Sequence, residues 1–420
     1  MATFADAPLE IIEEIINALQ DDIAALEACS QTCSFLLPLC RKYIFRSIHI
    51  TPRSYSQRGL PRVIKSFGIL LRNNPGIADL VRNLVFRMCW LDVEDDDVAH
   101  VLGRLHHLQS FELVNGEFMI ITWNEIRQPF REALLRLIQL PSLSRLEISL
   151  ICDFPITAFY PCMNLADLTL ARLTRPTMAV SYEKDPSALE AAPQLRSFTF
   201  RLNSGPYAMH LLNARRPSGA CVLDFRNVRM LSVEADKEGD LVAIQAFIRV
   251  TEKLETLDYA GTYQDPTMPY HISLTILAGM TQGYTGFAAS MNASSLSTLR
   301  TLRLQHHIED DQQDPLCGLC EEISIISGRN MIEEIFLRVI IQTDCWCKTG
   351  SEWGGLDAVL SRGFPQLRYV SLDIDICVFS PSFSETALQD KVNEIPRKYF
   401  PWLSSNIQVT YNFSASVHWV

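Results

Sequence analysis

Residues 6–50 read DAPLEIIEEIINALQDDIAALEACSQTCSFLLPLCRKYIFRSIHI. Leu9, Ile12 and Ile16 follow one another at spacings of three and four residues, which predicts one apolar face of a helix. Asp21 and Asp22 break this pattern and can cap a second helix, and a third helix is expected to follow it. Three helices in about forty residues remove little surface from water, so we expect this unit to bury apolar surface against the rest of the chain or a partner protein.

The same stretch carries a sequence motif. Its residues are Pro8-Leu9-Glu10-Ile11-Ile12, Ile15-Ile16, Leu19, Leu26, Cys29-Ser30, Cys33, Pro38, Arg41 and Phe45-Arg46-Ser47-Ile48. Over about residues 6–50 this pattern resembles an F-box, in the version common in mushroom-forming fungi. Ala7 departs from the pattern, because the family usually has leucine there, and the change is expected to weaken contact with the family's partner.

A second pattern recurs from residue 81 onward, with apolar residues at positions 1, 4 and 6 of a short segment. Three copies repeat almost the same wording: PSLSRLEI at 141–148, PQLRSFTF at 193–200 and PQLRYVSL at 365–372. The middle residues of the ten segments are Leu84, Phe111, Leu146, Leu168, Phe198, Leu231, Leu257, Leu302, Ile335 and Val370. They lie about 32 residues apart on average, near the period of leucine-rich repeats and their longer variants.

This spacing predicts short strands whose last two apolar residues point to the same face. Helices are expected behind the strands, for example over 62–72 and 240–251, and stacking would bury the apolar faces in a curved solenoid. The predicted fold class is therefore α/β: a three-helix F-box bundle over residues 6–50, then an irregular leucine-rich-repeat solenoid of short parallel strands over 51–420. A terminal strand is expected from about Ile407.

Composition limits the classes of partner. The formal net charge of −11 argues against nucleic acid, since neutralising phosphates needs a basic surface. No apolar run approaches the about 18 residues that span a bilayer, and the start MATFADAPLE shows no secretory signal. We therefore expect a cytoplasmic or nuclear location, no membrane partner and reduced cysteines.

Catalytic and metal-binding motifs are sparse. The nucleophile elbow, phosphate-binding loop, dinucleotide fingerprint and zinc-protease motifs are all missing from the sequence, so no enzyme activity is expected. Cys317-x-x-Cys320 and Cys345-x-Cys347 could together offer four thiolates to zinc, but the second spacing is too tight for a common zinc knuckle. We interpret them as buried or loop cysteines, expect no metal and no cofactor, and expect the pair His306-His307 at the surface.

The F-box resemblance implies a partner and a set of contacts. In that family the helical unit binds an Skp-type adaptor, which links it to the cullin scaffold of a ubiquitin ligase. Adaptor contacts would come from Pro8, Leu9, Ile11, Ile12, Ile15, Ile16, Cys33, Leu36 and Pro38. An alternative is that the helices only cap the open end of a repeat array, with no link to ubiquitin.

The exposed strand face is the candidate surface for a second partner. Residues between and after the last two apolar positions would line it: Arg201, Glu234, Asp258, Arg303, Phe336 and Arg338. Charges of both signs with an aromatic residue suit recognition of a protein better than of a small molecule, although a merely solvated face fits equally well. Together with the resemblance, this predicts the substrate-recognition subunit of an SCF-type (Skp–cullin–F-box) ligase, with an interaction scaffold as the alternative.

Overall fold

Parallel strands, most of them followed by a helix or a turn, succeed one another along this mixed α/β chain. The computed structural model describes residues 8–52, 63–116, 120–174, 192–261, 284, 286–308, 315–316, 318–343, 352–379 and 385–419. The chain divides into two compact units, which we call the first unit (Met1–Pro193 with Ala214–Val222) and the second unit (Gln194–Asn213 with Leu223–Val420).

The first unit begins with the expected three-helix bundle. Its helices are α1 (Leu9–Ala18), α2 (Ile23–Thr32) and α3 (Leu36–Ile44). The carboxylate of Asp22 accepts a hydrogen bond from the backbone N–H of Ala25 at 2.9 Å, which confirms the predicted cap of α2. Side chains from all three helices form a small core made of Ile12, Ile16, Leu26, Leu36 and Cys40. The bundle therefore has an interior of its own.

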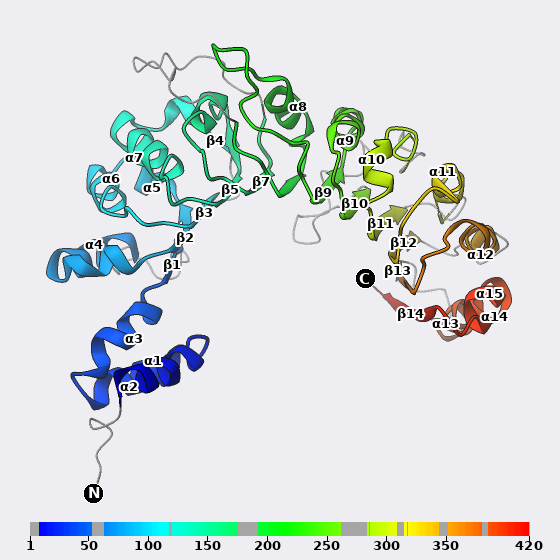
Figure 1. Cartoon of the computed structure of the whole chain (residues 1–420), viewed down its shortest axis with the longest axis horizontal. Coiled ribbons are helices and arrows are strands. Elements are labelled where there is room, and N and C mark those ends of the chain that lie inside the picture. Colours follow the sequence, from blue (N-terminus) through cyan, green and yellow to red (C-terminus); the bar gives the residue numbers. More distant parts are fainter. Residues whose placement is uncertain are drawn as a thin grey trace, which may run out of the picture. The chain divides into compact units, whose positions relative to one another are not determined.

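A parallel sheet follows directly in the first unit. Its strands, in spatial order, are β1 (Ser47–Ile50), β2 (Asn83–Met88), β3 (Ser110–Asn115), β5 (Arg145–Ser149) and β7 (Asp167–Ala171). A small second sheet pairs β4 (Ile121–Thr122) with β6 (Ile151–Cys152). The helical elements are α4 (Val63–Asn73), η3 (Pro75–Leu80), α5 (Trp90–Val93), α6 (Asp96–Leu102), η4 (Trp123–Glu125), α7 (Gln128–Ile138) and η5 (Ile156–Phe159). Helices α4, α6 and α7 lie on one side of the strands (Figure 1).

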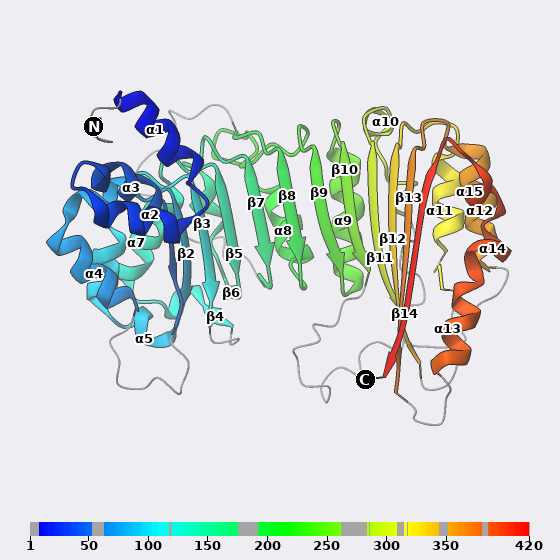
Figure 2. The same ribbon diagram turned by 90° about the horizontal axis from the view of Figure 1, so that it is seen from below.

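The second unit repeats this plan with longer strands. In spatial order they are β8 (Ser197–Arg201), β9 (Met230–Ala235), β10 (Thr256–Gly261), β11 (Thr301–Ile308), β12 (Glu334–Thr343), β13 (Tyr369–Val378) and β14 (Thr410–Trp419). The helices are α8 (Gly205–Asn213), α9 (Glu238–Val250), α10 (Ala293–Leu296), α11 (Leu319–Ile326), α12 (Glu352–Gly363), α13 (Glu385–Asn393), α14 (Ile395–Tyr399) and α15 (Pro401–Ser405). Helices α9, α11 and α12 lie behind the strands in Figure 2. We call the other face of this sheet, which carries no helix of the described residues, the open face.

The strand register agrees with the predicted repeat positions. In the first unit the middle residues Leu84, Phe111, Leu146 and Leu168 are successive cross-strand partners. In the second unit the same holds for Phe198, Leu231, Leu257, Leu302, Ile335 and Val370. All ten are buried, as expected for the inward-pointing residues of a strand with one covered face. The expected final strand begins at Thr410 instead, and the side chain of Ile407 is 100% exposed.

Three strands end in a sharp change of backbone direction. Leu150, Arg172 and Leu202 come directly after β5, β7 and β8, with φ of 64°, 52° and 55°. A left-handed conformation is uncommon for residues other than glycine, because the side chain crowds the backbone. These residues turn the chain out of the strand, and burial of the strands compensates for the local strain.

Among the described residues, no helix combines the length and the apolar character needed to cross a bilayer.

Candidate functional site

The bundle exposes several large apolar side chains. Ile11 and Ile15 lie four residues apart, on the same side of α1, with exposed fractions of 50% and 42%. Leu9, Ile23 and Phe35 are exposed to a similar degree. We call these five side chains the outer apolar residues. Single exposed apolar residues are ordinary, but five on so small a unit make it a candidate for contact with another molecule.

The nine predicted adaptor contacts divide into outer and inner residues. Pro8, Leu9, Ile11, Ile15 and Pro38 are exposed and Cys33 is half-buried. Ile12, Ile16 and Leu36 instead lie in the core of the bundle. Their side chains hold the helices together and are not available to a partner while the bundle stays folded. Ala7 lies outside the described residues.

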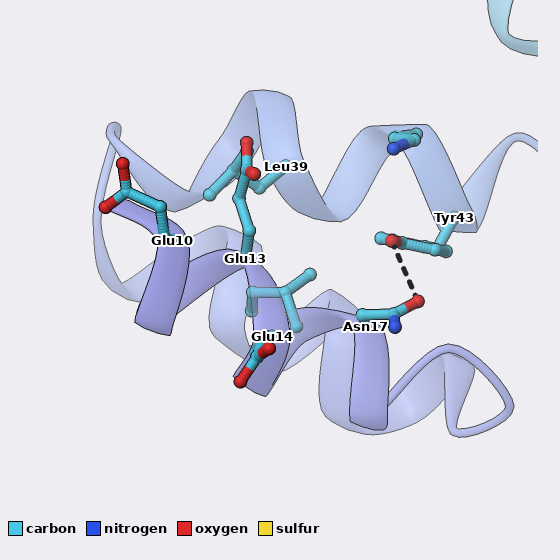
Figure 3. Close-up of a pocket in the computed structure, with 8 residues that line it drawn as sticks. Glu10, Glu13, Glu14, Asn17, Leu39 and Tyr43 are labelled. Atoms are coloured by element: carbon cyan, nitrogen blue, oxygen red, sulfur yellow. Dashed lines mark hydrogen bonds between the residues drawn. The ribbon is translucent and has the colours of Figure 1, made fainter. Parts of the chain in front are cut away.

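A shallow depression separates α1 from α3 (Figure 3). Side chains of α1, three of them carboxylates, line one wall, and side chains of α3 line the other. The lining residues are Glu10, Glu13, Glu14, Ile16 and Asn17 of α1, and Leu39, Lys42 and Tyr43 of α3. The hydroxyl of Tyr43 donates a hydrogen bond to the Asn17 side-chain oxygen at 3.1 Å, which ties the two helices together. The acidic wall suits a polar or basic protein segment better than an apolar small molecule.

The open face of the second unit brings three predicted contact residues into line. Asp258, Arg303 and Phe336 occupy the same level of the successive strands β10, β11 and β12. The guanidinium carbon of Arg303 lies 4.9 Å from the centre of the Phe336 ring, and that ring lies 5.2 Å from the ring of Tyr369. We call Asp258, Arg303, Phe336 and Tyr369 the central stripe. Sequence reasoning did not include Tyr369, although it precedes a middle residue in the repeat pattern.

Arg338 also lies on the open face, but its charge is already paired. Its Nε lies 3.5 Å from an oxygen of Asp373, and its Nη2 lies 3.5 Å from Asp375. All three groups are at least partly exposed, so these pairs stabilise the fold only weakly. Arg338 therefore presents a mixed ion-pair network to a partner, and not a free positive charge.

Glu234 corrects one prediction for this face. The alternation of β9 points it to the open face, yet only 7% of it is exposed. Burial, reinforced by the negative charge of Asp236, raises its pKa to about 7, and the nearby Arg201 opposes the shift only in part. Glu234 is thus a buried titratable group beside the exposed Arg201, and not a surface contact.

We expect Glu234 to make stability depend on pH. Its pKa in the folded chain lies above the ordinary value of 4.5, so the folded state holds a proton that the unfolded state releases between about pH 4.5 and about pH 7. The free energy of unfolding should therefore fall as pH rises through this window, by about 2 kcal/mol after allowance for screening by water. Glu234→Gln cannot titrate and should lose this part of the slope in urea unfolding at a series of pH values.

Glu255→Gln, at an exposed carboxylate, serves as the matched control and should keep the slope of the wild type. Equal pH dependence in wild type and Glu234→Gln would show that Glu234 ionises normally.

Two other expectations concern cysteine and histidine. Cys317, Cys345 and Cys347 lie outside the described residues, and Cys320 is half-buried in α11. His306 and His307 are buried in β11, whereas the repeat pattern predicted a loop boundary at the surface. The prediction was wrong because β11 continues through both residues to Ile308.

Comparison with known proteins adds no assignment: no family model matches the chain, and no curated protein matches it either. The outer apolar residues and the central stripe are thus two candidate contact regions of the described residues, characterised by their chemistry alone. One is apolar and small, and the other is a charged and aromatic strip. Both are typical of protein recognition.

Proposed function

We propose that this chain is the non-catalytic substrate-recognition subunit of an SCF-type ubiquitin ligase. In this proposal the bundle binds an Skp-type adaptor, and through it a cullin scaffold, in the cytoplasm or nucleus. The remaining chain would act as an irregular leucine-rich-repeat array that binds a protein substrate. The observation that carries the proposal is the set of outer apolar residues on a bundle whose sequence resembles an F-box.

The energetics favour a protein partner for the bundle. Completing the burial of a half-exposed Leu, Ile or Phe contributes about 1 kcal/mol, half of the value for a whole side chain. Five such residues supply several kcal/mol, which helps offset the entropy lost on association. The central stripe supports the second half of the proposal, because an Arg stacked on an aromatic ring is a common element of protein interfaces.

Substitutions on the outer side of α1 test adaptor binding. Ile11→Asp and Ile15→Asp should each reduce the affinity of the full chain for an Skp-type adaptor at least about tenfold, because an unpaired charge in an apolar interface costs more than 1.4 kcal/mol. Both positions are exposed, so the bundle should stay folded. Affinity is measured by titration calorimetry, and folding by circular dichroism.

Glu27→Gln, at an exposed position of α2 outside this depression, is the matched control and should bind like the wild type. Ile12→Asp is unsuitable, since it would place a charge in the core and unfold the bundle. A folded wild-type chain that binds no Skp-type adaptor would contradict the proposal and favour an interaction scaffold with a helical cap. Unchanged affinity in both Ile variants would move the contact away from this side of α1.

A further inference from the structure

Three side chains of metal-binding types meet on the open face, where β13 pairs with β14. Asp375 and Cys377 are two residues apart in β13, so both point to the same face. His418 of β14 is the register partner of Cys377. One ligand atom from each of the three lies within 4.8 Å of the other two. Pairing of the strands thus brings together a nitrogen, a sulfur and an oxygen donor.

The distances suit a small tetrahedral ion. The Cys377 sulfur lies 3.3 Å from Nε2 of His418, and Nδ1 of the same ring lies 3.2 Å from Oδ1 of Asp375. With zinc–ligand bonds of about 2.0–2.3 Å, neighbouring donors in a tetrahedral site lie about 3.3–3.8 Å apart. The sulfur and Nε2 already have this separation. Because one imidazole offers one nitrogen to an ion, Nδ1 keeps its contact with Asp375, and that carboxylate is an outer partner that orients the ring.

Neighbouring side chains orient the carboxylate. The hydroxyl of Ser416 donates a hydrogen bond to Oδ1 of Asp375 at 2.9 Å, and Nη2 of Arg338 lies 3.5 Å from Oδ2. Such outer hydrogen bonds hold metal-binding groups in place in known sites. His418 is exposed while Asp375 and Cys377 are half-buried, so an ion can reach the three groups from solvent.

The protonation state of the Cys377 thiol distinguishes catalysis from metal binding as the function of this cluster. Burial raises the pKa of its thiol, Asp375 raises it further, and Arg338 opposes them. A neutral thiol is a weak nucleophile, so catalysis by a Cys377–His418 pair is disfavoured. A bound dication reverses the local electrostatics and displaces the thiol proton. A nitrogen and a sulfur donor suit zinc, whereas magnesium and calcium favour oxygen donors.

We propose that Cys377 and His418 bind one zinc ion on the open face, with Asp375 orienting the imidazole through its other nitrogen. Two protein ligands leave the other two coordination positions open to water or to side chains of a bound protein. The ion cross-links β13 to β14 and releases one proton from Cys377 as it binds. This site is independent of adaptor binding, because it uses no residue of the bundle.

Metal titration of the full chain tests the site. After treatment with a chelator, the wild type should bind one Zn²⁺, and one Co²⁺ as a spectroscopic probe with a thiolate-to-cobalt charge-transfer band. Cys377→Ser should abolish that band, and His418→Ala should lower the affinity for Zn²⁺ at least about tenfold. Circular dichroism checks that each variant is folded.

The double variant Cys345→Ser with Cys347→Ser is the matched control and should keep both the stoichiometry and the band. A folded wild type that binds no stoichiometric metal would overturn the proposal and leave a hydrogen-bonded cluster only. A band that survives Cys377→Ser, or that disappears in the control, would assign the thiolate to another cysteine and likewise overturn it.

Discussion

Leu302→Ala is expected to lower the free energy of unfolding by about 2–5 kcal/mol, since it removes buried methyl groups and leaves a cavity. Leu302 is the middle residue of its repeat segment in β11 and is fully buried. Its register partners, Leu257 in β10 and Ile335 in β12, are buried as well. The cavity would open inside a layer of apolar side chains that strands on both sides hold in place. Urea unfolding followed by circular dichroism measures the loss.

Arg303→Ala, one residue further along β11, is the matched control. Its side chain is exposed on the open face, and its main contact is the ring of Phe336. Losing an exposed cation–π contact should cost less than about 1 kcal/mol. A larger loss from Arg303→Ala than from Leu302→Ala would mean that the two faces of β11 are reversed.

Asp240→Ala is expected to be comparably damaging, at about 2–5 kcal/mol, because it strips the partner from three backbone N–H groups. Asp240 is buried in the first turn of α9. One carboxylate oxygen accepts from Gly205 at 2.8 Å, and the other from Asp236 at 3.2 Å and Lys237 at 3.1 Å. The side chain thereby fastens the start of α8 to the start of α9. Urea unfolding again provides the measurement.

Two further variants isolate this contact. Glu238→Ala removes an exposed acid from the same turn of α9 and should change stability little. Gly205→Ala should destabilise by a different route, because its Cβ would lie 2.4 Å from Oδ1 of Asp240. Wild-type stability in both Asp240→Ala and Gly205→Ala would show that the junction between α8 and α9 does not contribute to folding.

Local signals in the sequence were enough to predict many elements. The helix expected over 62–72 is α4, and the one expected over 240–251 is α9. The ten middle residues were placed in strands and proved to be register partners within each unit. These predictions succeed because apolar periodicity is a property of a single segment and survives packing.

Burial on a predicted face was less predictable. Strand alternation places Glu234 on the open face. However, the chain turns at Leu202 after β8, the backbone N–H of Leu202 donates a hydrogen bond to the Glu234 carboxylate, and the side chain is buried. On α1 the apolar stripe is wide, and only packing against α2 and α3 decided that Ile12 and Ile16 point inward while Ile11 and Ile15 remain exposed. Contacts with neighbouring segments determine which of these side chains are buried, and a local sequence pattern does not contain that information.

The sequence by itself determined a helical start and a repeating strand pattern. The structure extends β13 to Val378, and strand alternation then places Asp375 and Cys377 on one face. Only the tertiary structure decided that His418 lies beside them, since α13, α14 and α15 separate the two strands in the chain. The register of β14 on β13 places His418 opposite Cys377, and a shift of one residue would turn His418 to the opposite face of the sheet.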